Sequence, residues 1–179
     1  IQNLEWAGQL QIPFTTGILI GLGESQKDRI RSIQAIVNCS KSYDHVQEII
    51  LQNYVPNRSS HIPAQEISSG ELKEIIDLVK EESPDISLQV PPNLNPDWLD
   101  LLPLGFSDLG GISQIDHVNP ESPWPSVKNM TEIMKEKKCH LRKRLPIYPE
   151  YYRRGWYSEK VGRVIEKWVQ NDEYPYYTQ

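Results

Sequence analysis

A glycine-spaced turn that ends in an acid follows a run of apolar residues near the start of the chain. The run spans Phe14 to Ile20, and Gly21, Gly23 and Glu24 come directly after it. Glycines let the backbone approach a bound molecule closely, so the pattern predicts a strand that delivers a cofactor-contacting loop. The simpler interpretation is tight packing of the strand on the next helix, where an acid at the helix start is favourable without a ligand.

Polar residues and glycines also follow the other apolar runs of the chain. The three clusters are Gln52 and Asn53, then Asn93 to Asn95, then Gly110, Gly111 and Ser113. Amide side chains both donate and accept hydrogen bonds, as binding of a heterocycle edge or a hydroxyl requires. The alternatives are backbone capping by Gln52 and Asn53, a helix cap at Asn95 and a tight turn at the paired glycines.

Asp116 and His117 form an acid and imidazole pair that follows the last polar cluster, and together they are candidates for proton transfer. In the structural alternative, Asp116 makes an Asx turn and His117 packs on Trp124. The other histidines, His45, His61 and His140, lie in connecting segments, and we expect them at the surface.

The elements that must position these residues alternate between strand and helix. We expect strands at Phe14 to Ile20, Val46 to Tyr54, Ile86 to Val90 and Phe106 to Leu109. The expected helices run from a Ser25 cap to about Val37, from a Ser68 or Ser69 cap through Val79, from Pro96 to Gly105, from Val127 to Lys135, and through Val161 to Trp168.

Successive strand and helix units predict parallel strands joined by right-handed crossovers. The polar clusters that follow the strands would then share one face, as they do in a (β/α)8 barrel. We therefore predict an α/β fold in which residues 1–125 form a partial (β/α)8 TIM-type barrel, its later four βα units. Residues 126–179 would form a C-terminal helical and aromatic extension. Because a half barrel leaves exposed edges, we expect the earlier strands to lie outside this sequence.

Composition narrows the functional class. A net charge of -5 and a pI near 5.4 argue against nucleic-acid binding, and we interpret the basic run from Lys135 to Arg144 as a solvated face. No apolar segment is long enough to cross a membrane and no signal peptide is evident, so we expect a cytoplasmic protein. Cys39 and Cys139 lack metal-ligand spacing and are expected to be free thiols.

An aromatic C-terminal segment follows the predicted barrel. We expect it to pack on the helices rather than to stack on bases, because no regular basic pattern accompanies it. Its members are Tyr148, Tyr151, Tyr152, Trp156, Tyr157, Tyr174, Tyr176 and Tyr177.

Several ordered motifs resemble a known family. The spacing Gly17-x-Leu19-x-Gly21-x-x-Glu24 resembles the adenine-contacting strand of radical S-adenosylmethionine enzymes. Four further segments are similar to the later half of the 7,8-didemethyl-8-hydroxy-5-deazariboflavin synthase family, which makes the deazaflavin chromophore of coenzyme F(420). They are Ile49 to Asn53, Gln89 to Pro96, Asp108 to Ser113, and Asp116 to Pro125.

This resemblance implies a radical lyase. In the family, a CxxxCxxC loop holds a 4Fe-4S cluster that cleaves S-adenosylmethionine to a 5'-deoxyadenosyl radical. The radical removes hydrogen from an adduct of tyrosine and a ribitylaminouracil, and ring closure releases ammonia. The cluster ligands are not in this chain, so the resemblance implies that activity needs the other half of the barrel.

Carried over to this sequence, the resemblance implies three groups of site residues. Gly17, Leu19, Gly21 and Glu24 would form the nucleoside-binding strand and turn. Gln52, Asn53, Asn93, Gly110, Gly111 and Ser113 would contact substrate, and Asp116 and His117 would serve proton transfer to the departing ammonia. Besides the missing half, the synthase that joins tyrosine to the uracil is an expected partner.

Two alternatives remain open at this point. The chain is compatible with a related radical enzyme, either the tyrosine-uracil joining synthase or a menaquinone-pathway enzyme. These relatives would share the first motif but lack the run from Asp108 to Pro125. The other alternative is an inactive, truncated half barrel.

Overall fold

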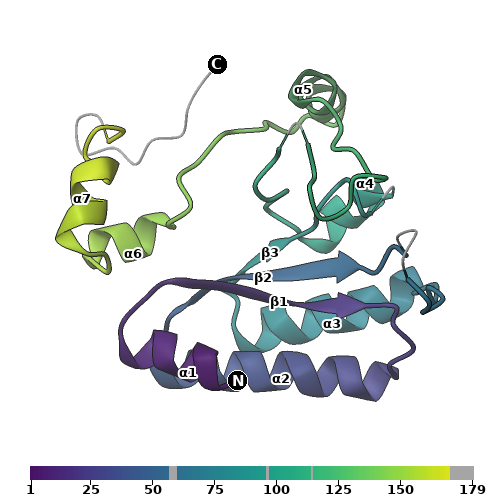
Figure 1. Cartoon of the computed structure of the whole chain (residues 1–179), viewed down its shortest axis with the longest axis horizontal. Coiled ribbons are helices and arrows are strands. Elements are labelled where there is room, and N and C mark those ends of the chain that lie inside the picture. The colour runs from purple at the N-terminus through teal and green to yellow at the C-terminus, as the bar shows by residue number, and fades with distance from the viewer. Residues whose placement is uncertain (57–59, 96, 114, 170–179) are drawn as a thin grey trace.

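The computed structural model describes residues 1–56, 60–95, 97–113 and 115–169 (Figure 1). The helix start predicted at Pro96 and the terminal tyrosines Tyr174, Tyr176 and Tyr177 lie outside the described residues.

Three parallel strands form an open sheet in the order β1-β2-β3. The strands are β1 (Phe14–Ile20), β2 (Val46–Asn53) and β3 (Ser87–Gln89). They confirm three predicted strands, with β2 and β3 slightly shorter than expected. The α/β class and the parallel arrangement are thus confirmed, and closure into a barrel stays a prediction.

The predicted fourth strand is wrong, because its backbone makes only a single parallel bridge, between Gln89 and Asp108. The amides of Ser107 and Asp108 both donate to the same Leu88 carbonyl, at 3.0 and 3.2 Å. Regular parallel pairing with β3 therefore does not continue along this segment. The Asp108 carboxylate then accepts a 2.7 Å hydrogen bond from the Gly110 amide, and Gly110 has a φ of 85°. This turn ends the pairing.

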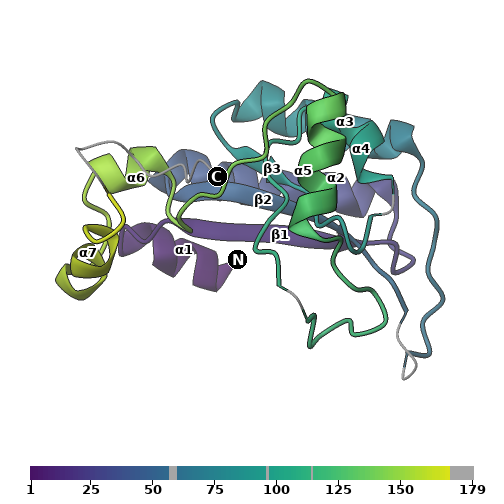
Figure 2. The ribbon, with the colours of Figure 1, turned by 90° about the horizontal axis from the view of Figure 1, so that it is seen from above.

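Three helices cover one face of the sheet, as Figures 1 and 2 show. They are α1 (Gln2–Gln9), α2 (Gln26–Tyr43) and α3 (Ser69–Glu82). Their apolar faces bury the main core against the strands, and burial of this apolar surface stabilises the packing. The most deeply buried side chains of this core are Ile33, Val37, Ile75, Ile76 and Val79 from the helices and Ile20, Ile49, Leu51 and Leu88 from the strands.

Capping boxes start both long helices at the residues that the sequence predicted. The Ser25 side chain accepts from the Asp28 amide, and the Ser68 side chain accepts from the Glu71 amide, while each acid bonds back to the cap residue. Each box satisfies amides that have no partner inside the helix. The helix α2 runs past its predicted end to Tyr43, and Asp44 closes it with a left-handed φ of 53°.

The rest of the described chain contains short helices. They are α4 (Trp98–Leu101), the 3-10 helix η1 (Leu102–Leu104), α5 (Val127–Glu136), α6 (Pro149–Arg153) and α7 (Glu159–Ile165). Gly105, with a φ of 110°, ends η1 as predicted. The helix α7 stops before Trp168, which the sequence placed within it.

The predicted helix cap at Asn95 is wrong. The N-cap position of α4 is Asp97, and its side chain makes no capping bond. Asn95 is buried, and its side-chain amide instead donates to the Pro91 carbonyl at 2.8 Å. A buried carbonyl needs a donor, and Asn95 supplies it within its own turn.

After α5 the chain returns to α6 and α7, which lie near the amino ends of the strands (Figures 1 and 2). The loops after the strands and the helix α5 lie toward the opposite, carboxyl end. The proposed boundary between residues 1–125 and 126–179 stays a prediction. In the part of the chain that the structure describes, every helix is too short or too polar to cross a membrane.

The Ser68 cap leads to a stability prediction. Replacing Ser68 with alanine should lower the free energy of unfolding by about 1 kcal/mol, because the Glu71 amide loses its partner. Urea denaturation measures this difference. Ser69→Ala, one position into the helix and also exposed, is the matched control. Equal effects of the two changes would show that the cap contributes nothing.

Candidate functional site

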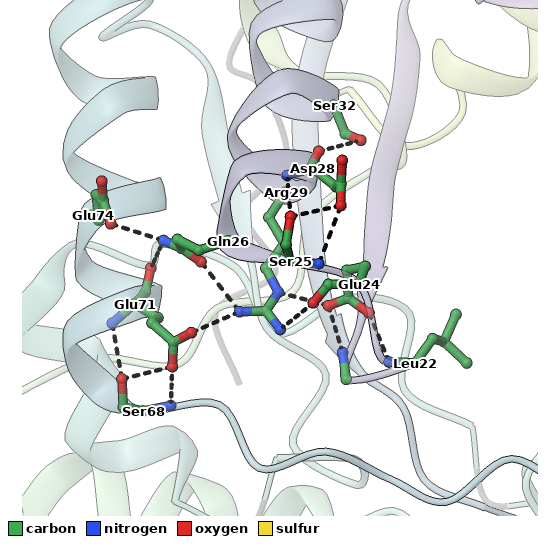
Figure 3. Close-up of polar contacts among 11 residues, drawn as sticks. Leu22, Glu24, Ser25, Gln26, Asp28, Arg29, Ser32, Ser68, Glu71 and Glu74 are labelled. Atoms are coloured by element: carbon green, nitrogen blue, oxygen red, sulfur yellow. Dashed lines mark hydrogen bonds and ion pairs between the residues drawn. The ribbon is translucent and has the colours of Figure 1, made fainter.

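The glycine turn after β1 is held by the acid that ends it. One oxygen of the Glu24 carboxylate accepts from the Gly21 amide at 2.8 Å, and the other accepts from the Leu22 amide at 2.7 Å (Figure 3). Gly21 and Gly23 have φ values of 96° and 100°, which favour glycine. Glu24 therefore holds the turn in place by binding two of its backbone amides. This agrees with the interpretation that Glu24 orients the loop.

A buried arginine joins this turn to the two long helices. Arg29 in α2 has a side chain only 1% exposed, and its Nε donates to Glu24 at 2.6 Å. Its Nη1 donates to Glu71, in the first turn of α3, at 2.9 Å. Its Nη2 also donates to the Glu24 carbonyl at 3.1 Å. One guanidinium thus fixes the turn relative to α2 and α3 (Figure 3).

The electrostatics of Glu24 follow from these contacts. Partial burial opposes ionisation, but the Gly21 amide and the Arg29 guanidinium stabilise the carboxylate and lower the pKa of Glu24 to about 2. Glu24 is consequently ionised at neutral pH, with both oxygens already engaged.

The strand register brings the ends of β1 and β2 together. Leu19 pairs with Gln52, and Ile20 pairs with Asn53. Leu19 is 41% exposed on the sheet face that α2 and α3 leave uncovered, and Gly17 on the same strand is also exposed. An exposed apolar side chain therefore lies beside Gln52 on the neighbouring strand.

Gly17 is explained by packing within the sheet. A Cβ built at Gly17 would come within 2.2 Å of the Ile50 carbonyl oxygen on the paired strand. Such a contact is impossible, so only glycine fits at this point of the register. Its predicted contact with a nucleoside stays a prediction.

Asn53 and Asn93, at the ends of β2 and β3, share an unusual property. The side-chain oxygen of each is buried and has no hydrogen-bond partner among the described residues. Buried acceptors in native proteins are almost always paired. Both amides are therefore suited to meet a donor on a bound molecule.

Asn93 is brought together with Asp116, a second predicted site residue. The Asn93 Nδ2 donates to Asp116 Oδ2 at 2.8 Å and to the Ser122 carbonyl at 3.2 Å. Asp116 Oδ1 accepts from the amides of Val118 and Asn119, both at 2.8 Å. The Asx turn that the sequence left open as an alternative is present.

The other predicted residues of this region are more exposed. His117 and Gly111 are exposed, and the exposed Ser113 hydroxyl donates to the Ile115 carbonyl at 2.8 Å. A Cβ at Gly110 would collide with the Gln89 side chain, so this glycine is required by close packing. The roles of His117, Gly111 and Ser113 stay predictions.

A cavity of about 1100 Å³ lies between the sheet and the segment that follows α5. Its described lining includes Gly110 and Gly111, but it contains none of the other predicted site residues. Glu48, Gln89 and Arg144 also line it. The cavity therefore joins the predicted glycine turn to a polar cluster that the sequence did not predict.

This cluster is centred on Glu48, a residue of β2 that is only 2% exposed. Arg144 pairs with Glu48 at 3.0 Å and also with Asp108. The Tyr148 hydroxyl donates to the same two carboxylates at 3.0 and 3.3 Å, and the Arg144 guanidinium lies 4.2 Å from the centre of its ring. Thr15 donates to the other Glu48 oxygen at 3.2 Å.

An irregularity in the sheet helps to build the cluster. The register shifts between Phe14 and Thr15, so that Val46 pairs with Phe14 and Glu48 pairs with Thr15. The extra residue, Gln47, donates to Thr15 at 3.1 Å and to the Pro146 carbonyl at 3.0 Å. Bulges of this kind redirect side chains locally. Gln47 and Glu48 consequently both reach the segment that carries Arg144.

Burial dominates the ionisation of this cluster. Desolvation, and then the neighbouring Asp108 carboxylate, raise the pKa of Glu48, although the Arg144 guanidinium opposes the shift. Burial and Asp108 also raise the pKa of Tyr148 well above its usual range, so its phenol stays a donor.

Two expectations about the surface need correction. The basic run was interpreted as solvated, but the Arg144 side chain is 19% exposed and paired with two acids. His45 was expected at the surface, but it is fully buried and packs edge-on against Tyr43 at 5.8 Å, because β2 begins directly behind it. Burial lowers the pKa of His45.

The aromatic segment packs partly on itself. Tyr151 is buried against Trp156 at 5.6 Å, and Tyr152 stacks on Tyr157 at 5.8 Å. Tyr148 reaches the strands rather than the helices, through the Glu48 cluster. A signal for that cluster existed in the sequence, since the charged Glu48 directly precedes the apolar run Ile49 to Leu51 within the strand.

The described residues do not fit a metal cluster. Cys39 is a buried free thiol and Cys139 an exposed one, as expected. Across residues 1–56, 60–95, 97–113 and 115–169, no three His, Cys, Asp or Glu side chains gather in a way that could bind a metal ion. This described part of the chain therefore offers no ligand set for a 4Fe-4S cluster.

The fold and site define an α/β protein whose polar residues gather at the ends of parallel strands, and comparison with known proteins identifies its relatives. The chain is homologous to 7,8-didemethyl-8-hydroxy-5-deazariboflavin synthases. It is 42% identical to the synthase of Methanosarcina acetivorans over 180 residues, covering 97% of this chain and 53% of the relative.

Other relatives give the same picture. The synthase of Methanosarcina barkeri is 43% identical and that of Archaeoglobus fulgidus 40% identical, each over 97% of this chain. The matches cover 54% and 55% of those proteins. The chain thus spans about half the length of the curated relatives that it matches. No protein-family model matches it.

The lowered pKa of Glu24 makes its stabilising effect dependent on pH. A carboxyl whose folded pKa lies below its unfolded value stabilises the fold above the unfolded value, near 4.5, and this stability is lost as pH falls toward about 2. Glu24→Gln should therefore cost about 2 kcal/mol at neutral pH, with a shrinking difference below about pH 4.5. Urea denaturation across this range measures it.

Glu81→Gln in α3 is the matched control, because it makes the same chemical change at an exposed position. A pH-independent difference between wild type and Glu24→Gln would contradict the assignment of the effect to the ionised carboxylate.

The Glu48 cluster predicts a large effect of removing its cation. Arg144→Met leaves Glu48 and Asp108 without a counter-charge, and it should lower the free energy of unfolding by about 3–5 kcal/mol. Lys143→Met, at the exposed neighbouring position, should change stability by less than about 0.5 kcal/mol. Similar effects of the two changes in urea denaturation would show that Arg144 is solvated in solution.

Proposed function

We propose that this chain is the later half of a radical S-adenosylmethionine lyase that forms 7,8-didemethyl-8-hydroxy-5-deazariboflavin, the chromophore of coenzyme F(420). The substrate would be a hydroxybenzyl ribityl-uracil adduct derived from tyrosine, and the reaction would release ammonia. The observation that carries the proposal is the homology to synthases of this name, at 42% identity over 97% of the chain.

The open face of the sheet supports a role in nucleoside binding. Leu19 and Gly17 form an exposed surface on β1, and Leu19 pairs with Gln52 on β2. A planar base can pack on such a surface, and an amide can bond its edge. S-adenosylmethionine, when bound, would supply the radical chemistry, and this chain would hold its nucleoside through Gly17, Leu19 and Gly21, with Glu24 shaping the turn.

The substrate would lie nearer the ends of β2 and β3. Gln52, Asn53 and Asn93 offer amides there, and two of these amides have a buried oxygen without a described partner. Gly110 and Gly111 would border the substrate on the side of the cavity, and Ser113 would contact it from the segment that follows. Their part would be to bind and orient the adduct and to exclude water from it.

The chain would work only as part of a larger barrel. Its described residues do not fit the 4Fe-4S cluster, and the earlier strands of a (β/α)8 barrel would supply the cluster ligands. Such strands would pair with the free edge of β1, and the uncovered face of the sheet would then line the hollow. The proposed partners are thus the remainder of the barrel and the synthase that joins tyrosine to the uracil.

The complete enzyme that contains this chain provides the test. After anaerobic reconstitution, it should convert the adduct to the deazaflavin, detected by the absorbance and fluorescence of the product. Turnover of a different substrate, with none of this product, would favour another radical enzyme of related build and overturn the proposal.

The paired amides give a sharper prediction in the same assay. The double change of Gln52 and Asn53 to alanine should slow turnover by about tenfold or more, because bonds to the substrate are lost, while the visible spectrum of the cluster stays intact. Asn38→Ala, on the exposed face of α2, is the control and should keep full activity. An unchanged rate in the double variant would remove these residues from the substrate site.

A further inference from the structure

The Asn93 side chain has a fixed orientation. Its Nδ2 faces the Asp116 carboxylate at 2.8 Å and the Ser122 carbonyl at 3.2 Å. Both of these groups only accept hydrogen bonds, so the amide must turn its NH2 toward them. Its two donors are then used, and its oxygen points the other way.

Asp116 is itself held rigidly. Its Oδ1 accepts from the Val118 and Asn119 amides at 2.8 Å, and its Oδ2 receives the Asn93 bond. These donors, with the Asn119 amide first, lower the pKa of Asp116. The side chain is thus an ionised acceptor at neutral pH, committed to the loop on one side and to Asn93 on the other.

The Asn93 oxygen has no partner among the described residues although it is buried. An unpaired buried acceptor costs about 1–3 kcal/mol, and native structures seldom keep one without a purpose. Asn93 follows β3 after Val90 and two prolines, toward the strand end where the other polar clusters gather. The free oxygen is therefore an acceptor prepared for a donor that comes from outside the described chain.

We infer that Asp116 is a positioning residue, which fixes the Asn93 amide so that its oxygen accepts a hydrogen bond from a hydroxyl or ring N–H of the substrate. The inference rests on the proposed function, in which the ribityl-uracil adduct carries both kinds of donor. It differs from the prediction that Asp116 transfers protons. Asp116 acts on the substrate only through Asn93.

The substitution Asp116→Asn in the complete enzyme tests this role. The new amide keeps an oxygen for the Val118 and Asn119 amides, but it presents an NH2 to the NH2 of Asn93. Asn93 must then turn over, and its donors replace its acceptor toward the substrate. KM for the adduct should rise about tenfold, with kcat within about twofold and with an unshifted pH profile of kcat.

A double-mutant cycle separates positioning from a general structural role. Once Asn93→Ala has removed the amide, adding Asp116→Asn should raise KM by less than about twofold further. The same chemical change at Asp100, exposed on the nearby helix α4, is the control and should leave KM and kcat unchanged. Thermal unfolding of each variant shows whether it is folded.

The outcomes are distinct. A fall in kcat with a shifted pH profile in Asp116→Asn would make Asp116 a proton-transfer group and overturn the inference, as would additive effects in the double variant. If Asp116→Asn does not fold, Asn93→Asp provides the second test, because a carboxylate facing Asp116 should also raise KM. Failure of the wild-type enzyme to convert the adduct would instead overturn the proposed function.

Discussion

The buried guanidinium of Arg29 is the interaction on which the arrangement of the site depends. It bonds the Glu24 side chain and carbonyl at the end of the glycine turn, and it bonds Glu71 at the start of α3. A charge this deeply buried is tolerated only when its donors are satisfied, so the turn and the two helix starts must keep their relative places. The loop after β1 is consequently a rigid part of the fold.

Two groups of polar side chains lie at opposite ends of the strands of the sheet. Toward the amino ends of β1 and β2, Glu48 and Arg144 tie the C-terminal segment to the strands, and their charges are neutralised within the protein. Toward the carboxyl ends, the Asn53 and Asn93 oxygens have no hydrogen-bond partner among the residues that the structure describes. The charged groups of the first set bond to one another and stabilise the fold. The two amide oxygens of the second set are available to accept hydrogen bonds from a ligand. This division agrees with the placement of chemistry in barrels of parallel strands.

Local features were predicted well because they depend on neighbours in the chain. The two capping boxes, the glycine at the end of η1 and the three strands follow from residue types within a few positions of one another. The fourth strand failed because its pairing was decided by two amides that compete for the Leu88 carbonyl. Asn95 failed as a cap because burial directed its amide to Pro91. Neither effect is visible in a pattern of apolar residues.

The sequence by itself determined the α/β class, the starts of the long helices, and the clusters of polar residues that follow the strands. Only the tertiary structure decided which of these residues meet. Glu48 and Arg144 are 96 positions apart, and Asn93 and Asp116 are 23 apart, so no local pattern specifies either contact. Each pair forms because burial removes water from a charge or an amide, and the nearest group of complementary chemistry must then replace it.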